Sequence, residues 1–286
     1  MTQPLILDLD GSVLPLPGTQ TIALQQHQEA IRFGCRRSVL HALGRELAPR
    51  LDPRPPVVFL GSGDYHHVSY LLIERLRALN ESIQVVVFDN HPDNMRYPFG
   101  IHCGSWVRHV SRLPFVSRVH VVGITSTDVE AGRLWENYLG PLYSGKVVYY
   151  CVQRQLRAMR RLGIRHGHTF PSVGALFDQL FDVLSATTEP LYLSIDKDVL
   201  ASDVVQTNWD QGVMRLEELL RAIGVLRERL LASDVVGEVS SYRYHSLFKR
   251  LLSGLDRQPE IPPRTLHDWQ LRHQQANRQL LALLGA

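Results

Sequence analysis

The segment that decides the fold is residues 85–93, which read VVVFDNHPD. Its first four residues are apolar, and a run of consecutive apolar residues fits a strand buried on both faces of a parallel sheet. Similar runs recur along the chain and alternate with segments in which apolar residues have helical spacing. Strands are predicted at residues 5–7, 57–60, 85–88, 119–122, 147–150, 191–195 and 235–236, and helices at residues 68–79, 216–231 and 265–284. This alternation predicts an α/β fold, a three-layer α/β/α sandwich with a mostly parallel central sheet.

The composition is ordinary for a globular protein and excludes only a few classes of function. The chain has 286 residues, of which 44% are hydrophobic and 21% charged, so its core is large enough to need no disulfide or metal staple. The formal net charge is only +3, and the basic residues are scattered, which argues against a nucleic-acid partner. Three cysteines without close spacing form neither a disulfide framework nor a zinc motif, and they indicate a cytoplasmic protein. We expect no signal peptide and no membrane segment, because no apolar run reaches roughly 20 residues.

Chemically active side chains follow several of the predicted strands. Residues 61–67 read GSGDYHH after one strand, and DNHPD follows the strand at 85–88. Asp196-Lys197-Asp198 ends a third strand, and Gly237-Glu238 follows a fourth. Ligands of parallel sheets bind beyond the carboxyl ends of the strands. We therefore expect these carboxylates and imidazoles to meet at one edge of the sheet.

The acidic residues at these strand ends indicate a metal site. Asp89, His91 and Asp93 alternate with a period of two, so in an extended chain they point the same way, and Asp196 and Asp198 repeat the pattern. So many like charges in a partly buried cleft call for divalent cations. Carboxylates and imidazoles without thiolates favour Mn²⁺. The ligands are too many for one ion and suit a pair about 3.5–4 Å apart that share a bridging hydroxide.

These residues resemble the arginase–agmatinase (ureohydrolase) family, in a divergent form. Its motifs are Gly-Gly-Asp-His-Ser, Asp-Ala-His-x-Asp and Ser-x-Asp-x-Asp-x-x-Asp-Pro. The second is matched by Asp89, His91 and Asp93, the third by Ser194, Asp196 and Asp198, and the first loosely by residues 61–67. The resemblance favours His66 as the ligand from the first motif, with His67 as the alternative. It implies an arginase/deacetylase-like fold, a single ureohydrolase-like domain over residues 1–286, and two Mn²⁺ per chain bound by His66, Asp89, His91, Asp93, Asp196 and Asp198.

The resemblance also implies catalytic roles and a reaction. Residues 100–104 read GIHCG and are similar to a family segment with a proton-shuttling histidine, which would be His102. Glu238 corresponds to a glutamate that binds the substrate's guanidinium, and Asp93 would orient the hydroxide. The implied reaction is hydrolysis of a linear amidine, at a guanidino or formimino carbon–nitrogen bond. The family's Asp-Pro is replaced by Ala201-Ser202 and the substrate loop at 207–212 is unusual, so the substrate itself stays open.

Three other hypotheses start from different features. Residues 5–13 read LILDLDGSV and resemble the nucleophile motif of haloacid-dehalogenase-type phosphatases, with Asp8 as nucleophile, but this leaves the acidic strand ends unexplained. A non-catalytic metal protein on the same fold is a second alternative. A deacetylase-like enzyme with one metal and the pair His66-His67 is a third. Lys197 is expected to face away from its neighbouring aspartates and form a salt bridge behind the sheet. The expected partner is a small guanidino or related molecule, and a homo-oligomer is an open option.

Overall fold

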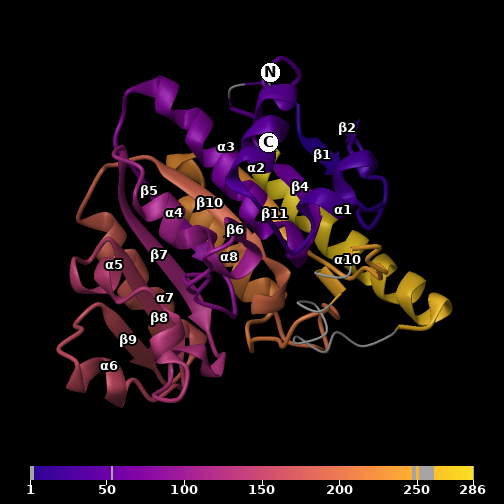
Figure 1. Cartoon of the computed structure of the whole chain (residues 1–286). Helices are drawn as coiled ribbons and strands as arrows, with labels where there is room; N and C mark the ends of the chain where they lie inside the picture. The colour runs from indigo at the N-terminus through magenta and orange to yellow at the C-terminus, as the bar shows by residue number, and fades with distance from the viewer. Residues whose placement is uncertain (1–2, 53, 247–248, 251–260, 286) are drawn as a thin grey trace.

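A parallel sheet between two layers of helices forms the centre of the computed structural model (Figure 1), which describes residues 3–52, 54–246, 249–250 and 261–285. Within these residues the sheet has nine strands in the order β2-β1-β4-β11-β10-β5-β7-β8-β9, and its paired neighbours run parallel. The strands are β1 (Leu5–Asp8), β2 (Gln20–Ala23), β4 (Val58–Ser62), β5 (Ile83–Phe88), β7 (Val116–Ile124), β8 (Val147–Val152), β9 (Gly167–Phe170), β10 (Leu191–Asp196) and β11 (Leu230–Glu238). Two short strands, β3 (Gly34–Cys35) and β6 (Ile101–His102), pair antiparallel outside the sheet.

The helices divide between the two faces of the sheet. They are α1 (Gln28–Ile31), α2 (Arg37–Leu47), α3 (Ser69–Arg75), α4 (Trp106–Ser111), α5 (Leu139–Tyr143), α6 (Arg157–Arg161), α7 (Val173–Ser185), α8 (Leu216–Leu226) and α10 (Pro263–Leu284). Side chains of α1 to α6 pack in one core with Val85 and Val87, and those of α7, α8 and α10 pack in a second core with Val86 and Phe88. Because successive strand residues face opposite sides, each run of valines serves both cores. The predicted three-layer sandwich is therefore confirmed.

Helix α10 shows why the sequence folds this way locally. Its buried residues are His273, Ala276, Asn277, Leu280 and Leu284, and steps of three or four residues place most of them on one stripe of the helix. Two of the five are polar, which indicates that this stripe meets polar groups as well as the core. No helix in the described part of the chain is both long and apolar enough to cross a membrane.

The predicted elements are all present, with differences at their ends. The helix predicted over 216–231 is wrong at its end, because α8 stops at Leu226, a 3-10 turn follows, and β11 already begins at Leu230. The helix predicted over 68–79 ends at Arg75 and continues as a 3-10 turn to Leu79. The 3-10 turns are η1 (Gln25–His27), η2 (Gly63–Val68), η3 (Leu76–Leu79), η4 (Cys103–Ser105), η5 (Thr127–Val129), η6 (Leu134–Glu136), η7 (Lys197–Val199) and η8 (Arg227–Arg229).

Candidate metal centre

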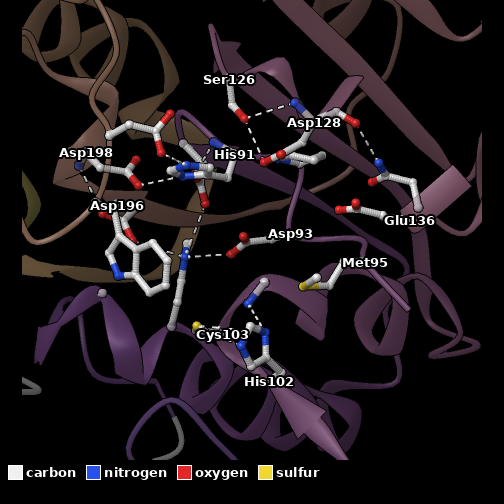
Figure 2. Close-up of a pocket in the computed structure, with 18 of the residues that line it drawn as sticks. His91, Asp93, Met95, His102, Cys103, Ser126, Asp128, Glu136, Asp196 and Asp198 are labelled. Carbon is white, nitrogen blue, oxygen red and sulfur yellow. Dashed lines mark hydrogen bonds and ion pairs between the residues drawn. The ribbon is translucent and has the colours of Figure 1, made fainter. Parts of the chain in front are cut away.

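A cavity of about 510 Å³ opens at the carboxyl ends of β4, β5, β7 and β10. Figure 2 shows His91, Asp196 and Asp198 gathered on one wall, Asp93 near the middle, and His102 across from them. All six residues that the sequence predicts as metal ligands line this cavity: His66, Asp89, His91, Asp93, Asp196 and Asp198. The strand ends therefore meet as the parallel topology requires.

The first group of ligand atoms surrounds the imidazole of His66. Its Nδ1 lies 3.2 Å from Asp89 Oδ2, 3.0 Å from Asp93 Oδ2 and 3.4 Å from Asp196 Oδ2. His66 comes from η2, directly after β4, and is 1% exposed. His67 is also fully buried but does not line the cavity, and its Nε2 lies 4.0 Å from the thiol of Cys35. The geometry thus favours His66 over His67.

The second group surrounds His91. Its Nδ1 lies 2.8 Å from Asp198 Oδ2 and 3.6 Å from Asp89 Oδ1. Asp89 therefore offers one oxygen to each group. The expected extended geometry is wrong here: β5 ends at Phe88, and the backbone N–H of His91 donates to Asp89 Oδ1 across 2.6 Å. A turn, not strand alternation, brings these side chains together.

Asp93 takes an unusual backbone conformation. Its φ is +44°, a left-handed value that non-glycine residues seldom adopt and that clusters at functional sites. The indole Nε1 of Trp106 donates to Asp93 Oδ2 across 2.7 Å, so the carboxylate has a fixed direction. The turn after β5 and α4 together aim this oxygen at His66.

Electrostatics in the cavity favour added positive charge. Burial first, and the charge of Asp89 second, raise the pKa of Asp93 and of Asp198 to about 7. Burial also raises the pKa of Asp196 well above its usual value, with Asp198 as the next cause. Burial tends to lower the pKa of His66, but the carboxylates of Asp89 and Asp93 outweigh it and raise the pKa. Protons or dications can supply the charge that this group lacks.

The donor set fits divalent cations. His66 Nδ1 and Asp89 Oδ2 are buried atoms with no hydrogen-bond partner among the described residues, although they face each other. Groups of this kind usually have a partner, and an ion is one explanation for those that do not. The two groups, His66–Asp89–Asp93 and Asp89–His91–Asp198, each hold their atoms within 4.8 Å of one another. Carboxylate oxygens and imidazole nitrogens are donors that divalent metal ions use, so the residues present fit such an ion.

A hydrogen-bonded chain supports His66 from behind. The Nε2 of His66 lies 2.9 Å from Ser194 Oγ, and Ser194 donates to Asp234 Oδ1 across 2.8 Å. Tyr192 also donates to the carboxylate of Asp234. These contacts fix the ring so that Nδ1 faces the cavity. Asp64, two residues before His66 in η2, pairs with Arg32 Nε at 2.8 Å.

His102 lines the cavity on the wall opposite the ligands. Its Nδ1 accepts the backbone N–H of Gly104 across 2.9 Å, so a neutral ring carries its proton on Nε2. The ring of Phe33 meets it edge-on with centroids 4.4 Å apart. Burial lowers the pKa of His102 to about 4. The side chain is therefore neutral near pH 7.

Glu238 does not line the cavity, so the predicted contact with a substrate guanidinium is wrong for this structure. Lys197 Nζ and Asn277 Nδ2 donate to its carboxylate instead. The reason is backbone geometry. Gly237 has φ +86° and the pairing of β11 with β4 shifts register there, so Glu238 turns toward α10 rather than following Val236. The predicted salt bridge of Lys197 behind the sheet is confirmed.

Several residues outside the ligand set also line the cavity, although no motif in the sequence predicts them. They include Phe33, Met95, Tyr97, Ser126, Asp128, Arg133, Glu136 and Asp210. Ser126 and Asp128 follow β7 directly, so the strand-end rule used elsewhere would have found them. Asp210 lies in the loop at 207–212, where nothing in the sequence predicts a conformation. Trp209 in the same loop lines the cavity and stacks on Phe33 with centroids 6.2 Å apart.

Comparison with known proteins identifies the family. The model of the Arginase family matches residues 19–245. The chain belongs to the arginase family. Members of this family are metal-dependent hydrolases of carbon–nitrogen bonds. A Thermotoga maritima protein described as uncharacterized is 30% identical over 206 residues, which are 72% of this chain and 67% of that protein.

Solved structures share the arginase fold. A hypothetical agmatinase from Burkholderia thailandensis superposes with a TM-score of 0.54 at 14% identity, over 99% of this chain and 85% of that one. Formimidoylglutamase from Bacillus subtilis gives 0.52 at 16%, over 85% of this chain. The chain spans 66% of the length of that enzyme. Proclavaminate amidino hydrolase from Streptomyces clavuligerus gives 0.50 at 17%, over 84% of this chain and 70% of that one.

Family membership sets aside the phosphatase hypothesis. Asp8 ends β1 and does not line the cavity. Its carboxylate accepts the backbone N–H of Gly11 across 2.7 Å and the side-chain amide of Gln25. Asp10 pairs with the buried guanidinium of Arg32. Both aspartates have ordinary structural partners.

Proposed function

We propose that this chain hydrolyses the carbon–nitrogen bond of a linear amidine, using two Mn²⁺ ions held by His66, Asp89, His91, Asp93, Asp196 and Asp198. The observation that carries this proposal is the shared carboxylate of Asp89, which offers Oδ2 to the His66 group and Oδ1 to the His91 group. Adjacent sites that share a carboxylate suit two ions a few ångströms apart. Two bound ions of this kind lower the pKa of water enough to supply hydroxide near neutral pH.

The products follow from the bonds that change. The oxygen of water bonds to the amidine carbon, the carbon–nitrogen bond breaks, and the departing nitrogen leaves as an ammonium. A guanidinium and water thus give urea and an ammonium, with charge conserved. A formimino compound gives formamide in place of urea.

Asp93 is the candidate for moving a proton, and His102 is the candidate for binding the leaving group. The carboxylate of Asp93, held by Trp106 at 2.7 Å, can accept the proton that the attacking water still carries. His102 is neutral near pH 7, since burial lowers its pKa to about 4. Its Nε2 already carries the ring proton, because Nδ1 accepts the backbone N–H of Gly104. His102 would therefore donate a hydrogen bond from Nε2–H to the leaving nitrogen, and the proton that Asp93 accepts would pass directly from Asp93 to that nitrogen.

The cavity favours a cationic substrate even though Glu238 lies elsewhere. Besides the ligand residues, the acidic groups that line it are Asp128, Glu136 and Asp210. The lining guanidinium, Arg133, pairs with Asp128 Oδ1 across 3.0 Å. Acidic groups in a cleft attract cations and disfavour an anionic substrate tail. We therefore place guanidino compounds with a neutral or cationic tail ahead of those with a free carboxylate.

A product-specific assay tests the proposal. Mn²⁺-loaded protein is incubated with arginine, agmatine, guanidinobutyrate and a formimino compound, and urea, formamide and ammonia are measured. We expect one of these substrates to be hydrolysed, with Asp93→Ala inactive and Asp8→Asn fully active. Protein that holds two Mn²⁺ ions yet releases no product from any of the four would contradict the proposal. So would a fully active Asp93→Ala variant.

A further inference from the structure

We propose that Asp210 is a positioning residue for the metal centre: its carboxylate holds the imidazole of His91 from the side opposite the ligand group. The proposal rests on the two-ion function proposed above, and it assigns part of the unusual loop at 207–212 to metal binding. Asp210 Oδ1 lies 2.8 Å from His91 Nε2. A carboxylate behind a ligating histidine fixes its orientation and makes it a stronger ligand.

The two ring nitrogens of His91 have different partners. Nδ1 faces the ligand group, 2.8 Å from Asp198 Oδ2, and Nε2 faces Asp210. A neutral imidazole carries one proton. When Asp210 accepts that proton's hydrogen bond at Nε2, Nδ1 presents its lone pair to the ion. Without this acceptor, the ring can carry its proton on Nδ1 and lose its capacity to bind.

The loop that carries Asp210 is tied to the strand ends that carry the ligands. The backbone oxygen of Asp210 accepts from Asn90 Nδ2 across 2.9 Å, and Gly212 N donates to the backbone oxygen of Asp198 across 2.7 Å. Asn90 N in turn donates to Asp198 Oδ1 across 2.9 Å. The loop, the β5 end and the β10 end therefore form one hydrogen-bonded unit around His91.

Asp210 offers a second role, binding of the substrate's cation, and the two roles predict different results. The side chain is 70% exposed at the cavity rim, so a ligand can reach it. A substrate-binding carboxylate would change KM and leave metal affinity alone. A positioning carboxylate changes metal affinity in the absence of any substrate. We favour positioning because Oδ1 already meets His91, and solvent exposure sets the expected effect near the lower end of the about 10–100-fold range for such partners.

The test is Mn²⁺ binding to Asp210→Asn and Asp210→Ala, compared with wild type and with Asp203→Asn. Asp203 is a matched control, because it is 69% exposed, precedes the same loop, and pairs with Arg215 away from the cavity. Metal-stripped proteins are titrated with Mn²⁺ by calorimetry, with electron paramagnetic resonance as a count of bound ions. We expect wild type and Asp203→Asn to bind two ions, and both Asp210 variants to bind one of the two about 10-fold more weakly. The expected kinetic change is a lower kcat at saturating Mn²⁺, with KM little altered.

Two results separate failure of this proposal from failure of the proposed function. If wild type binds two ions and both Asp210 variants bind them with unchanged affinity, Asp210 has no positioning role, and a raised KM would identify it as a substrate ligand. If wild-type protein does not bind two ions, the two-ion function itself is overturned, and this proposal with it. Circular dichroism of each variant checks that the fold is retained.

Discussion

The segment Asp196-Lys197-Asp198 separates two buried groups of charged side chains, and only one of them balances its own charge. On the cavity side, Asp196 and Asp198 lie among other carboxylates, and burial raises the pKa of both. On the α10 side, the ammonium of Lys197 meets the carboxylate of Glu238, and Asn277 bonds to both. Burial tends to raise the pKa of Glu238, yet Lys197 and His273 lower it. The charges on the α10 side therefore neutralise each other, whereas the carboxylates on the cavity side need added cations.

The difference shows that burial alone does not mark a metal site. Both sides are almost inaccessible to solvent, with Lys197 at 0% and Asp198 at 2% exposure. What distinguishes the cavity side is that its acceptors outnumber the cations that the chain itself provides. Gly237 decides which side Glu238 joins, because the positive φ there turns the side chain away from the cavity.

Removal of a carboxylate on the cavity side should have the largest effect, on metal binding and on hydrolysis. Asp89→Ala removes the carboxylate that both ligand groups share. We expect loss of both ions and of all detectable hydrolysis, while the fold is retained. Metal analysis of the dialysed variant checks this. A variant that keeps two tightly bound ions would contradict the shared role of Asp89.

Removal of the ion pair on the α10 side should lower the free energy of unfolding and leave catalytic activity unchanged. Glu238→Ala leaves Lys197 buried without its counter-charge, and such losses cost about 3–5 kcal/mol of unfolding free energy. Urea denaturation measures the change, and KM of the folded fraction should match wild type. Replacing both residues, as in Lys197→Met with Glu238→Leu, should recover most of the loss. A large increase in KM without loss of stability would instead return Glu238 to the substrate site.

A substitution at Gly237, which lies between the two sides, should have an intermediate effect on stability and on Mn²⁺ binding. Gly237→Ala places a Cβ 2.3 Å from Asp196 Oδ1 and 2.6 Å from Lys197 N, at a φ of +86°. We expect a loss of about 1–3 kcal/mol from the backbone strain alone, and weaker Mn²⁺ binding as Asp196 shifts. Gly224→Ala in α8 is the control, because a Cβ added there meets nothing within 4 Å and alanine favours helix. Equal effects of the two substitutions on metal affinity would refute the close approach.

The smallest predicted effect is on the pH dependence of the stabilisation by Mn²⁺. Asp93 and Asp198 have pKa values raised to about 7 in the folded chain, so metal-free protein holds protons there that the unfolded chain releases near pH 4. This contribution to stability is present below pH 4 and is lost as the pH rises toward 7. Bound ions replace those protons. The rise in Tm on adding Mn²⁺ should therefore be larger at pH 8 than at pH 5.5.

Comparing the same protein with and without metal removes other titrations from this measurement. Buried His120 and His273 have lowered pKa values, so their contribution to stability grows with pH, but it is the same in both samples. A Tm increment from Mn²⁺ that is equal at the two pH values, or larger at pH 5.5, would contradict the assignment.

The sequence predicts the sheet and the cavity side well because both depend on local patterns. Valine runs such as residues 85–88 predict buried strands, and parallel strands must bring their carboxyl ends to one edge. Strands β2 and β9 are too short and too exposed to leave such a pattern. The choice between His66 and His67 depends on the 3-10 turn η2, which the sequence does not specify.

The remaining differences come from backbone geometry and loop conformation. The sequence around Glu238 is similar to the family motif, but the left-handed backbone at Gly237 turns the Glu238 side chain away from the cavity. Asp210 lies 119 residues from His91, and only the folded loop brings the two together. Contacts of this kind depend on long-range packing, so a pattern in one sequence cannot predict them.

Metal stoichiometry tests the central claim most directly. Metal-stripped wild-type protein is titrated with Mn²⁺, excess ion is removed, and bound manganese is measured by mass spectrometry alongside electron paramagnetic resonance. We predict two Mn²⁺ per chain with the spin coupling of a bridged pair. Saturation at one ion per chain, or two ions without coupling, would contradict a shared site built around Asp89.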